Sequence, residues 1–261
     1  MPSTAGRSTR SFPSDACGYT RWPVADLPID LGHERAARLS AVLDIEGKIP
    51  RALDALGPMA GSDVLLVDAG EGARARQLAD LGAHLTLLER DAARAEALRR
   101  AINGSSSVTV REGVPTATGL PDRSVDRVVS CWSAFRDRHE TEAAEALRVL
   151  RPGGRLLVLH DYGRDDVSRL RDADLPEYGT WSRRDGWFLR SGFKVRVVHC
   201  WWTFDSVETA SVFLADAFEE RGREVAATMR RPRLSYNVAI YHRERSENEA
   251  EAELVSAARS R

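Results

Sequence analysis

Two groups of residues in this chain have the types and spacing that chemistry requires. The first is Asp68-Ala69-Gly70-Glu71-Gly72, an acidic loop with two glycines that follows the apolar run 64–67. Gly70 and Gly72 have no Cβ, so the loop can turn sharply and let a ligand approach the backbone where a helix begins. Glu89 ends a second apolar run about 20 residues later, the spacing at which an acidic side chain meets the ribose of a nucleotide. Together they predict a seat for a nucleotide-type cofactor.

The second group is the titratable run from His160 to Asp166. An imidazole has a pKa near neutrality, so His160 could take a proton from an acceptor hydroxyl or amine, with Asp161 or Asp165 orienting the ring. His160 and Asp161 are the catalytic candidates, and Tyr162, Arg164 and Trp181 are the expected substrate contacts. The alternative is that His160 caps a strand and that the carboxylates pair with arginines in a solvated loop.

Short apolar runs alternate with helical patterns along most of the chain, which predicts a parallel, doubly wound α/β sheet. Ligands bind such sheets at the carboxyl ends of the strands, where both groups of residues lie. The expected strands are 64–67, 85–88, 128–131, 155–159, 195–202 and 234–241, and the expected helices are 33–43, 49–56, 74–81, 92–102, 143–150 and 206–228, the last with Ser206 as its N-cap. A further helix is expected to end at Gly192.

The motifs resemble those of the class I S-adenosylmethionine-dependent methyltransferases over roughly residues 60 to 245. The loop 68–72 is similar to the first motif of that family, and Glu89 to its ribose-binding acid. Residues 113–126, which contain Leu-Pro-Asp-Arg-Ser-Val-Asp, fit the family's third-strand segment and the loop that leads into strand four. Arg151-Pro152-Gly153-Gly154 resembles the turn before its fifth strand. The resemblance implies a mostly parallel seven-stranded sheet with an antiparallel last strand, and S-adenosylmethionine as cofactor.

The resemblance also implies a set of cofactor contacts: Asp68, Gly70, Gly72, Glu89, Val114 and Cys131. Two positions depart from the family's pattern. Arg74 stands where a third glycine is usual, and Val114 stands where the family carries an adenine-binding Asp. Val114 cannot accept a hydrogen bond, a loss of about 0.5–1.5 kcal/mol. These departures motivate the alternative of a catalytically degenerate protein that keeps the fold as an interaction or ligand-sensing module.

Net charge and missing motifs favour some classes of substrate and cofactor over others. The 261 residues carry a formal net charge of −1, and the Asn/Asp-Pro-Pro-aromatic motif of enzymes that methylate nucleic-acid amino groups is missing. Both observations favour a small-molecule acceptor over a nucleic acid. A nicotinamide oxidoreductase is less favoured because the Gly-x-Gly-x-x-Gly pattern is absent. Cys17, Cys131 and Cys200 lack metal spacing, which predicts a metal-free, reducing and therefore cytoplasmic setting, and no run is long enough for a membrane span.

We therefore expect three parts: a leader or lid over residues 1–30, in which Tyr19 and Trp22 either fold over the substrate or anchor the leader, a methyltransferase-like domain over 31–245 with a candidate substrate lid at 162–185, and a charged tail over 246–261. The expected activity is transfer of a methyl group from S-adenosylmethionine to the oxygen or nitrogen of a small molecule. The sequence leaves the acceptor and the oligomeric state unspecified.

Overall fold

The computed structural model describes residues 27–29, 31, 33–102, 106–136, 139–171 and 175–247. The predicted leader, apart from 27–29, and nearly all of the predicted tail lie outside these residues. The expectations for Cys17, Tyr19 and Trp22 fall there too. Leu27 is described and is buried in the core.

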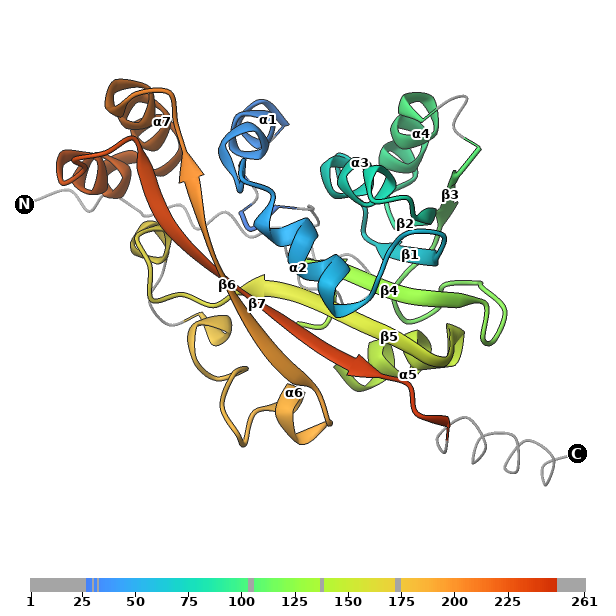
Figure 1. Cartoon of the computed structure of the whole chain (residues 1–261). Helices are drawn as coiled ribbons and strands as arrows, with labels where there is room; N and C mark the ends of the chain where they lie inside the picture. The colour runs from blue at the N-terminus through green and yellow to red at the C-terminus, as the bar shows by residue number, and fades with distance from the viewer. Residues whose placement is uncertain are drawn as a thin grey trace, which may run out of the picture.

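A seven-stranded sheet forms the centre of the molecule, with the order β3-β2-β1-β4-β5-β7-β6 (Figure 1). The pairs formed among β1 to β5 are parallel, whereas β7 is antiparallel to both of its neighbours. This arrangement confirms the predicted fold class. The strands are β1 (Asp63–Val67), β2 (His84–Glu89), β3 (Val108–Glu112), β4 (Val125–Cys131), β5 (Leu150–Asp161), β6 (Lys194–Thr203) and β7 (Arg233–Glu244).

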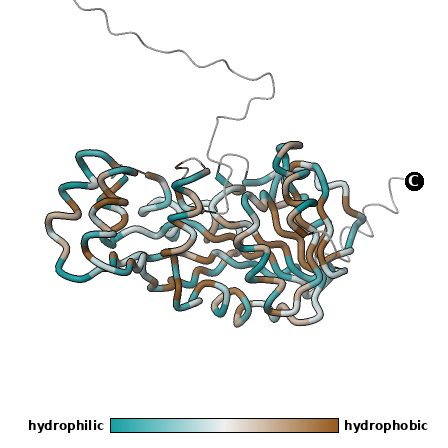
Figure 2. The backbone as a smooth tube through the Cα atoms, turned by 90° about the horizontal axis from the view of Figure 1, so that it is seen from above, coloured by the Kyte–Doolittle hydropathy of each residue, from teal (hydrophilic) through white to brown (hydrophobic). Residues whose placement is uncertain are grey.

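Helices cover both faces of the sheet because the central strands are apolar on both sides, as Figure 2 shows by the hydrophobic colour of the interior. Leu66, Val129 and Leu157 face one core, which is closed by α1 (His33–Val42), α2 (Lys48–Leu56), α3 (Ala73–Asp80) and α7 (Val207–Ala227), while α4 (Ala92–Ala101) adds Leu98. Their neighbours Val128 and Leu156 face the other core, under α5 (His139–Val149) and α6 (Trp187–Arg190).

Several predicted boundaries need correction. The third strand ends at Glu112, so the segment 113–126 is mainly the connection to β4, which begins at Val125. The helix predicted over 143–150 begins at His139, and α6 is a single turn. The predicted N-cap is confirmed, because the Ser206 side chain accepts a hydrogen bond from the Thr209 N–H.

Helix α7 contains a break that the sequence pattern does not predict. Glu219 has φ 50° and ψ −124°, so two helical pieces meet there at a kink (Figure 1). Gly222 lies just beyond the kink, and a Cβ at this position would come 1.9 Å from the Leu214 carbonyl oxygen. Only a glycine permits this close approach.

Candidate cofactor and substrate site

The strand order reverses between β1 and β4, and ligands of doubly wound sheets bind at such a switch point, beyond the carboxyl ends of the strands. The loop 68–72 follows β1, and the segment 132–136 follows β4. Glu89 ends the neighbouring strand β2, with its backbone paired to β3. The sheet therefore brings the predicted cofactor residues to one edge.

The glycine loop has the backbone that its sequence predicts. Gly70 and Gly72 have φ values of 57° and 80°, in the left-handed region, and Gly72 is the N-cap residue of α3. Asp68, with φ 52°, also adopts this region, although it carries a side chain. Such a conformation is uncommon outside glycine and recurs at ligand sites.

The two acids of the predicted seat are buried and hold the loop together. Glu89 accepts hydrogen bonds from the Gly70 N–H at 3.1 Å and from the Asp91 N–H at 3.1 Å. Asp68 instead forms a two-pronged ion pair with Arg90, at 2.9 and 2.5 Å. Burial raises the pKa of Glu89, and the nearby charge of Asp68 adds to this effect. Sequence reasoning missed Arg90, although its place directly after Glu89 was a signal.

Arg74, which stands where the family pattern has a third glycine, lies at the switch point between β1 and β4. Its side chain is only 2% exposed, and the guanidinium carbon lies 5.5 Å from the ring centre of Trp132, the residue that follows β4. The side chain also donates to Gln77 at 2.5 Å. Arg74 therefore points into the switch point instead of lying at the outer edge of the loop.

Two further predicted cofactor contacts lie near the same edge. Val114 is half-buried in the connection after β3, beside Gly113, whose N–H donates to the Glu89 carbonyl oxygen at 3.1 Å. Cys131 is buried at the end of β4. Val114 thus presents an apolar side chain after β3, and its contact with adenine stays a prediction.

His160 and Asp161 end β5, but neither side chain reaches solvent. The Nε2 atom of His160 lies 3.0 Å from the Ala134 carbonyl oxygen, and Trp181 packs against the imidazole ring at 4.7 Å. Burial and the charge of Arg136 hold the pKa of His160 well below its ordinary value, so the ring is neutral. In this structure the ring is part of the packed core, and its catalytic role stays a prediction.

Asp161 is the centre of a buried polar cluster. Its carboxylate accepts hydrogen bonds from the Trp132 indole N–H at 3.0 Å and from the Tyr236 hydroxyl, and it forms an ion pair with Arg171. Burial raises the pKa of Asp161, against the opposing effect of the Arg171 charge. Neither Asp161 nor Asp165 bonds to the His160 ring, so the predicted orienting contact is absent among the described residues.

The predicted lid, 162–185, is fixed to this edge by a second ion pair. Glu177 is buried and lies 3.0 Å from Arg136, whose side chain also donates to the Trp132 carbonyl oxygen at 3.0 and 3.2 Å. Trp181 is 7% exposed and packs on Arg136 at 5.7 Å. These contacts hold Glu177 and Trp181 beside the ends of β4 and β5.

The three expected substrate residues differ in their exposure. Trp181 is buried, Tyr162 is half-buried, and Arg164 is exposed with its guanidinium carbon 5.6 Å from the Tyr162 ring centre. Their contact with a substrate stays a prediction. The described residues contain no group of three His, Cys, Asp or Glu side chains arranged to hold a metal. None of the helices in the described part of the chain is long and apolar enough to span a membrane.

Comparison with known proteins agrees with this geometry. Residues 65–158 match the family model of the methyltransferase domain. No curated protein sequence matches the chain significantly. Among solved structures, the YcgJ protein from Bacillus subtilis is 16% identical with a TM-score of 0.52, over 77% of this chain and 99% of that protein. A candidate type II methyltransferase from Anaeromyxobacter dehalogenans is 19% identical with a TM-score of 0.53, over 76% of this chain and 95% of that one.

These identities establish similarity of fold, and the family model covers the segment from β1 to β5 that carries the predicted motifs. The resemblance inferred from the motifs is thereby confirmed at the level of the fold: residues 65–158 match the methyltransferase domain, and the chain has the fold of the class I S-adenosylmethionine-dependent methyltransferases.

Proposed function

We propose that this protein binds S-adenosylmethionine and transfers its methyl group to an oxygen or nitrogen of a small molecule. The observation that carries the proposal is the contact of the Glu89 carboxylate with the Gly70 N–H, because it joins the acid that ends β2 to the glycine loop after β1, beside the switch point. Asp68, Gly70, Gly72 and Glu89 are the residues that would hold the cofactor, beside Val114 and Cys131. This arrangement of acids and glycines fits a ribose-bearing ligand.

The cofactor, when bound, supplies an activated methyl group on a sulfonium. The chain's own contribution would then be mainly to position the acceptor and exclude water, an effect that can lower a barrier by about 7–11 kcal/mol. The buried, neutral His160 is consistent with a reaction that depends on positioning, because its ring packs beside the site and does not exchange a proton with solvent. The small-molecule acceptor is supported by the nearly neutral net charge.

A second candidate function is supported by Arg74. The side chain of this residue is buried against Trp132 at the switch point. A protein with this feature could keep the fold as an interaction or ligand-sensing module without transferring a methyl group. The two candidates differ in whether the chain binds the cofactor.

The test is a calorimetric titration with S-adenosylmethionine and, separately, S-adenosylhomocysteine. Micromolar binding of both is expected, and Glu89→Gln should weaken it by about tenfold, equivalent to 1.4 kcal/mol. Glu112→Gln is the matched control, because Glu112 ends the next strand, is exposed and pairs with Arg99 at 3.0 Å. Absence of heat at millimolar ligand would contradict the proposal and favour the non-catalytic candidate. Equal affinities of the Glu89 variant and the unmodified protein would reject the ribose assignment.

A further inference from the structure

A groove of about 410 Å³ lies beyond β6 and β7, at the end of the sheet where β1, β4 and β5 also have their carboxyl ends. Trp201 near the end of β6, Leu234 at the start of β7 and Val225 in the last turns of α7 supply its apolar surface. Four arginines also line it: Arg169, Arg230, Arg231 and Arg233. We call it the arginine groove.

The positive charge of the arginine groove is largely uncompensated. Arg230 and Arg231 are exposed, and their side chains form no hydrogen bond or ion pair with the part of the chain that the structure describes. Arg169 is 3.9 Å from Asp166, the one acid that lines the groove. The Asp166 carboxylate already accepts hydrogen bonds from the N–H and hydroxyl of Ser235, at 2.9 and 2.7 Å.

Arg233 and Trp201 form a prepared surface within the groove. The guanidinium carbon of Arg233 lies 4.3 Å from the ring centre of Trp201, so the indole holds the cation in place. Glu46, whose carboxylate senses the Arg233 charge, is itself paired with Lys48 at 2.7 Å. The charge of this neighbouring acid is therefore shared between Lys48 and Arg233.

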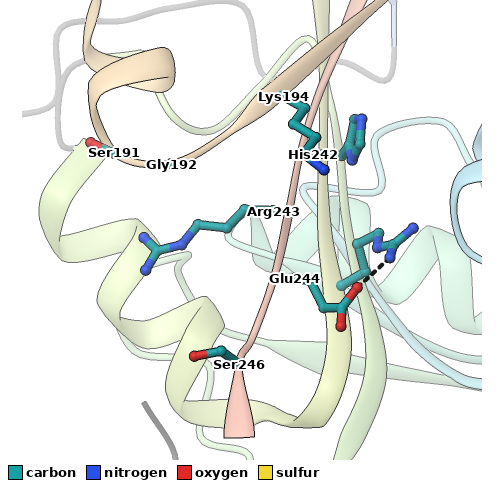
Figure 3. A pocket seen from close by; sticks show the side chains of 8 residues that line it. Ser191, Gly192, Lys194, His242, Arg243, Glu244 and Ser246 are labelled. Atoms are coloured by element: carbon teal, nitrogen blue, oxygen red, sulfur yellow. Dashed lines mark hydrogen bonds and ion pairs between the residues drawn. The ribbon is translucent and has the colours of Figure 1, made fainter. Parts of the chain in front are cut away.

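A second basic pocket provides a comparison (Figure 3). It lies at the opposite end of the sheet and is lined by Arg155, Lys194, His242, Arg243 and Glu244. There Arg155 forms an ion pair with Glu244 at 2.5 Å, drawn as a dashed line. That pocket contains a carboxylate that competes with any anion for its arginine, whereas Arg230 and Arg231 in the arginine groove have no such competitor among the described residues.

We propose that the arginine groove binds a small organic anion, a phosphate or carboxylate group carried on an apolar body. Guanidinium groups present paired N–H donors that match both kinds of oxyanion. The groove's volume is in the range of small-molecule sites, and its apolar side chains would contact the body of the ligand. The proposal is independent of S-adenosylmethionine binding, because no residue of the predicted cofactor seat lines the groove.

The test is a calorimetric titration of the full chain with phenyl phosphate and, separately, with benzoate, in the absence of any cofactor. Saturable one-site binding of at least one probe is expected, and the stronger probe identifies which anion the groove prefers. Phenol, which has the body without the charge, should not bind measurably, and inorganic phosphate should bind more weakly than phenyl phosphate. Arg230→Gln/Arg231→Gln should weaken binding on the order of tenfold or more, since two charge-assisted contacts are lost.

The matched control is Arg184→Gln/Arg196→Gln, which removes the same charge from two exposed arginines outside the groove. This control should bind the probe as the unmodified chain does. Equal weakening in both double variants would overturn the proposal, because it would show attraction to the overall charge. Absence of saturable binding of both probes, or displacement of the probe by a random oligonucleotide that binds more tightly, would also overturn it.

Discussion

Removal of the Arg171 side chain should destabilise the protein strongly, because it leaves the Asp161 carboxylate buried without its countercharge. Asp161 is 1% exposed and keeps only two neutral donors, the Trp132 indole N–H and the Tyr236 hydroxyl. Breaking a buried ion pair by removing one partner costs about 3–5 kcal/mol. Glu177 loses only a 3.7 Å contact and keeps Arg136 at 3.0 Å, so it adds little. Arg171→Met should therefore lose about 3–4 kcal/mol of unfolding free energy at pH 7.

The loss should be smaller at low pH. Burial already raises the pKa of Asp161 above its ordinary value, and removal of the Arg171 charge raises it further. A carboxyl group whose folded pKa is raised stabilises the fold below its unfolded pKa and loses that contribution as pH rises through the folded pKa. In the variant, protonation of Asp161 at pH 5 should therefore recover part of the stability that is lost at pH 7.

The assay is guanidinium unfolding followed by circular dichroism at both pH values. Arg190→Met is the control, since Arg190 is exposed on α6, and it should change the unfolding free energy by less than about 0.5 kcal/mol. The double variant Asp161→Asn/Arg171→Met removes both charges and should recover most of the loss. A loss below about 1 kcal/mol for Arg171→Met at pH 7, or no recovery in the double variant, would refute the reasoning.

Three further changes test separate parts of the structure. Gly222→Ala should lower the unfolding free energy by about 3 kcal/mol, because its Cβ would meet the Leu214 carbonyl oxygen at 1.9 Å. Gly179→Ala is the control, since a Cβ there would have no atom within 4 Å, and thermal melts of both variants should show that it is nearly neutral. The Arg148 guanidinium lowers the pKa of Glu145 to about 2, so Glu145 stabilises the fold above its unfolded pKa and loses this contribution as pH falls from about 4.5 to about 2. Glu145→Gln should lose about 1–2 kcal/mol at pH 7 after allowance for solvent screening, a difference that should vanish near pH 2 in acid titrations of stability. Because the pKa of His160 is lowered in the fold, unfolding should take up one extra proton below pH 6.5. The unfolding free energy should therefore fall with decreasing pH by up to about 1.4 kcal/mol per pH unit, and His160→Gln should remove this dependence. Equal slopes of unfolding free energy against pH in both proteins would show that the ring is charged in the fold.

The sequence predicts the fold well because its signals are local. Apolar runs mark the strands, the loop 68–72 marks the first turn, and Ser206 marks the start of α7. The kink at Glu219 has no such signal, because the helical pattern continues through it and no proline interrupts it. The kink brings the backbone of Gly222 against the Leu214 carbonyl oxygen of the same helix, an approach that residue spacing does not encode.

The site is predicted less completely because pairing partners far apart in sequence are invisible to periodicity. Asp161 and Tyr236 are 75 residues apart and meet only because β7 inserts next to β5. Position after a strand correctly brought His160 to the carboxyl edge, but it did not reveal that Trp181 covers the ring. Arg74 shows the same limit. The sequence shows an arginine where the family pattern has a glycine, but it does not show that the side chain packs against Trp132.

The charges at this edge of the sheet divide into two halves. Near the switch point and β5, three buried acids each pair with an arginine, and the buried Glu89 is held by backbone N–H groups; the pairs are Asp68 with Arg90, Asp161 with Arg171, and Glu177 with Arg136. Beyond β6 and β7, the arginine groove carries four arginines and one acid. A charged ligand is steered by the uncompensated half, because paired charges produce little field at a distance. An anionic molecule that approaches this edge is therefore drawn toward the arginine groove first, while the closely paired acids hold the rest of the edge in its packed arrangement.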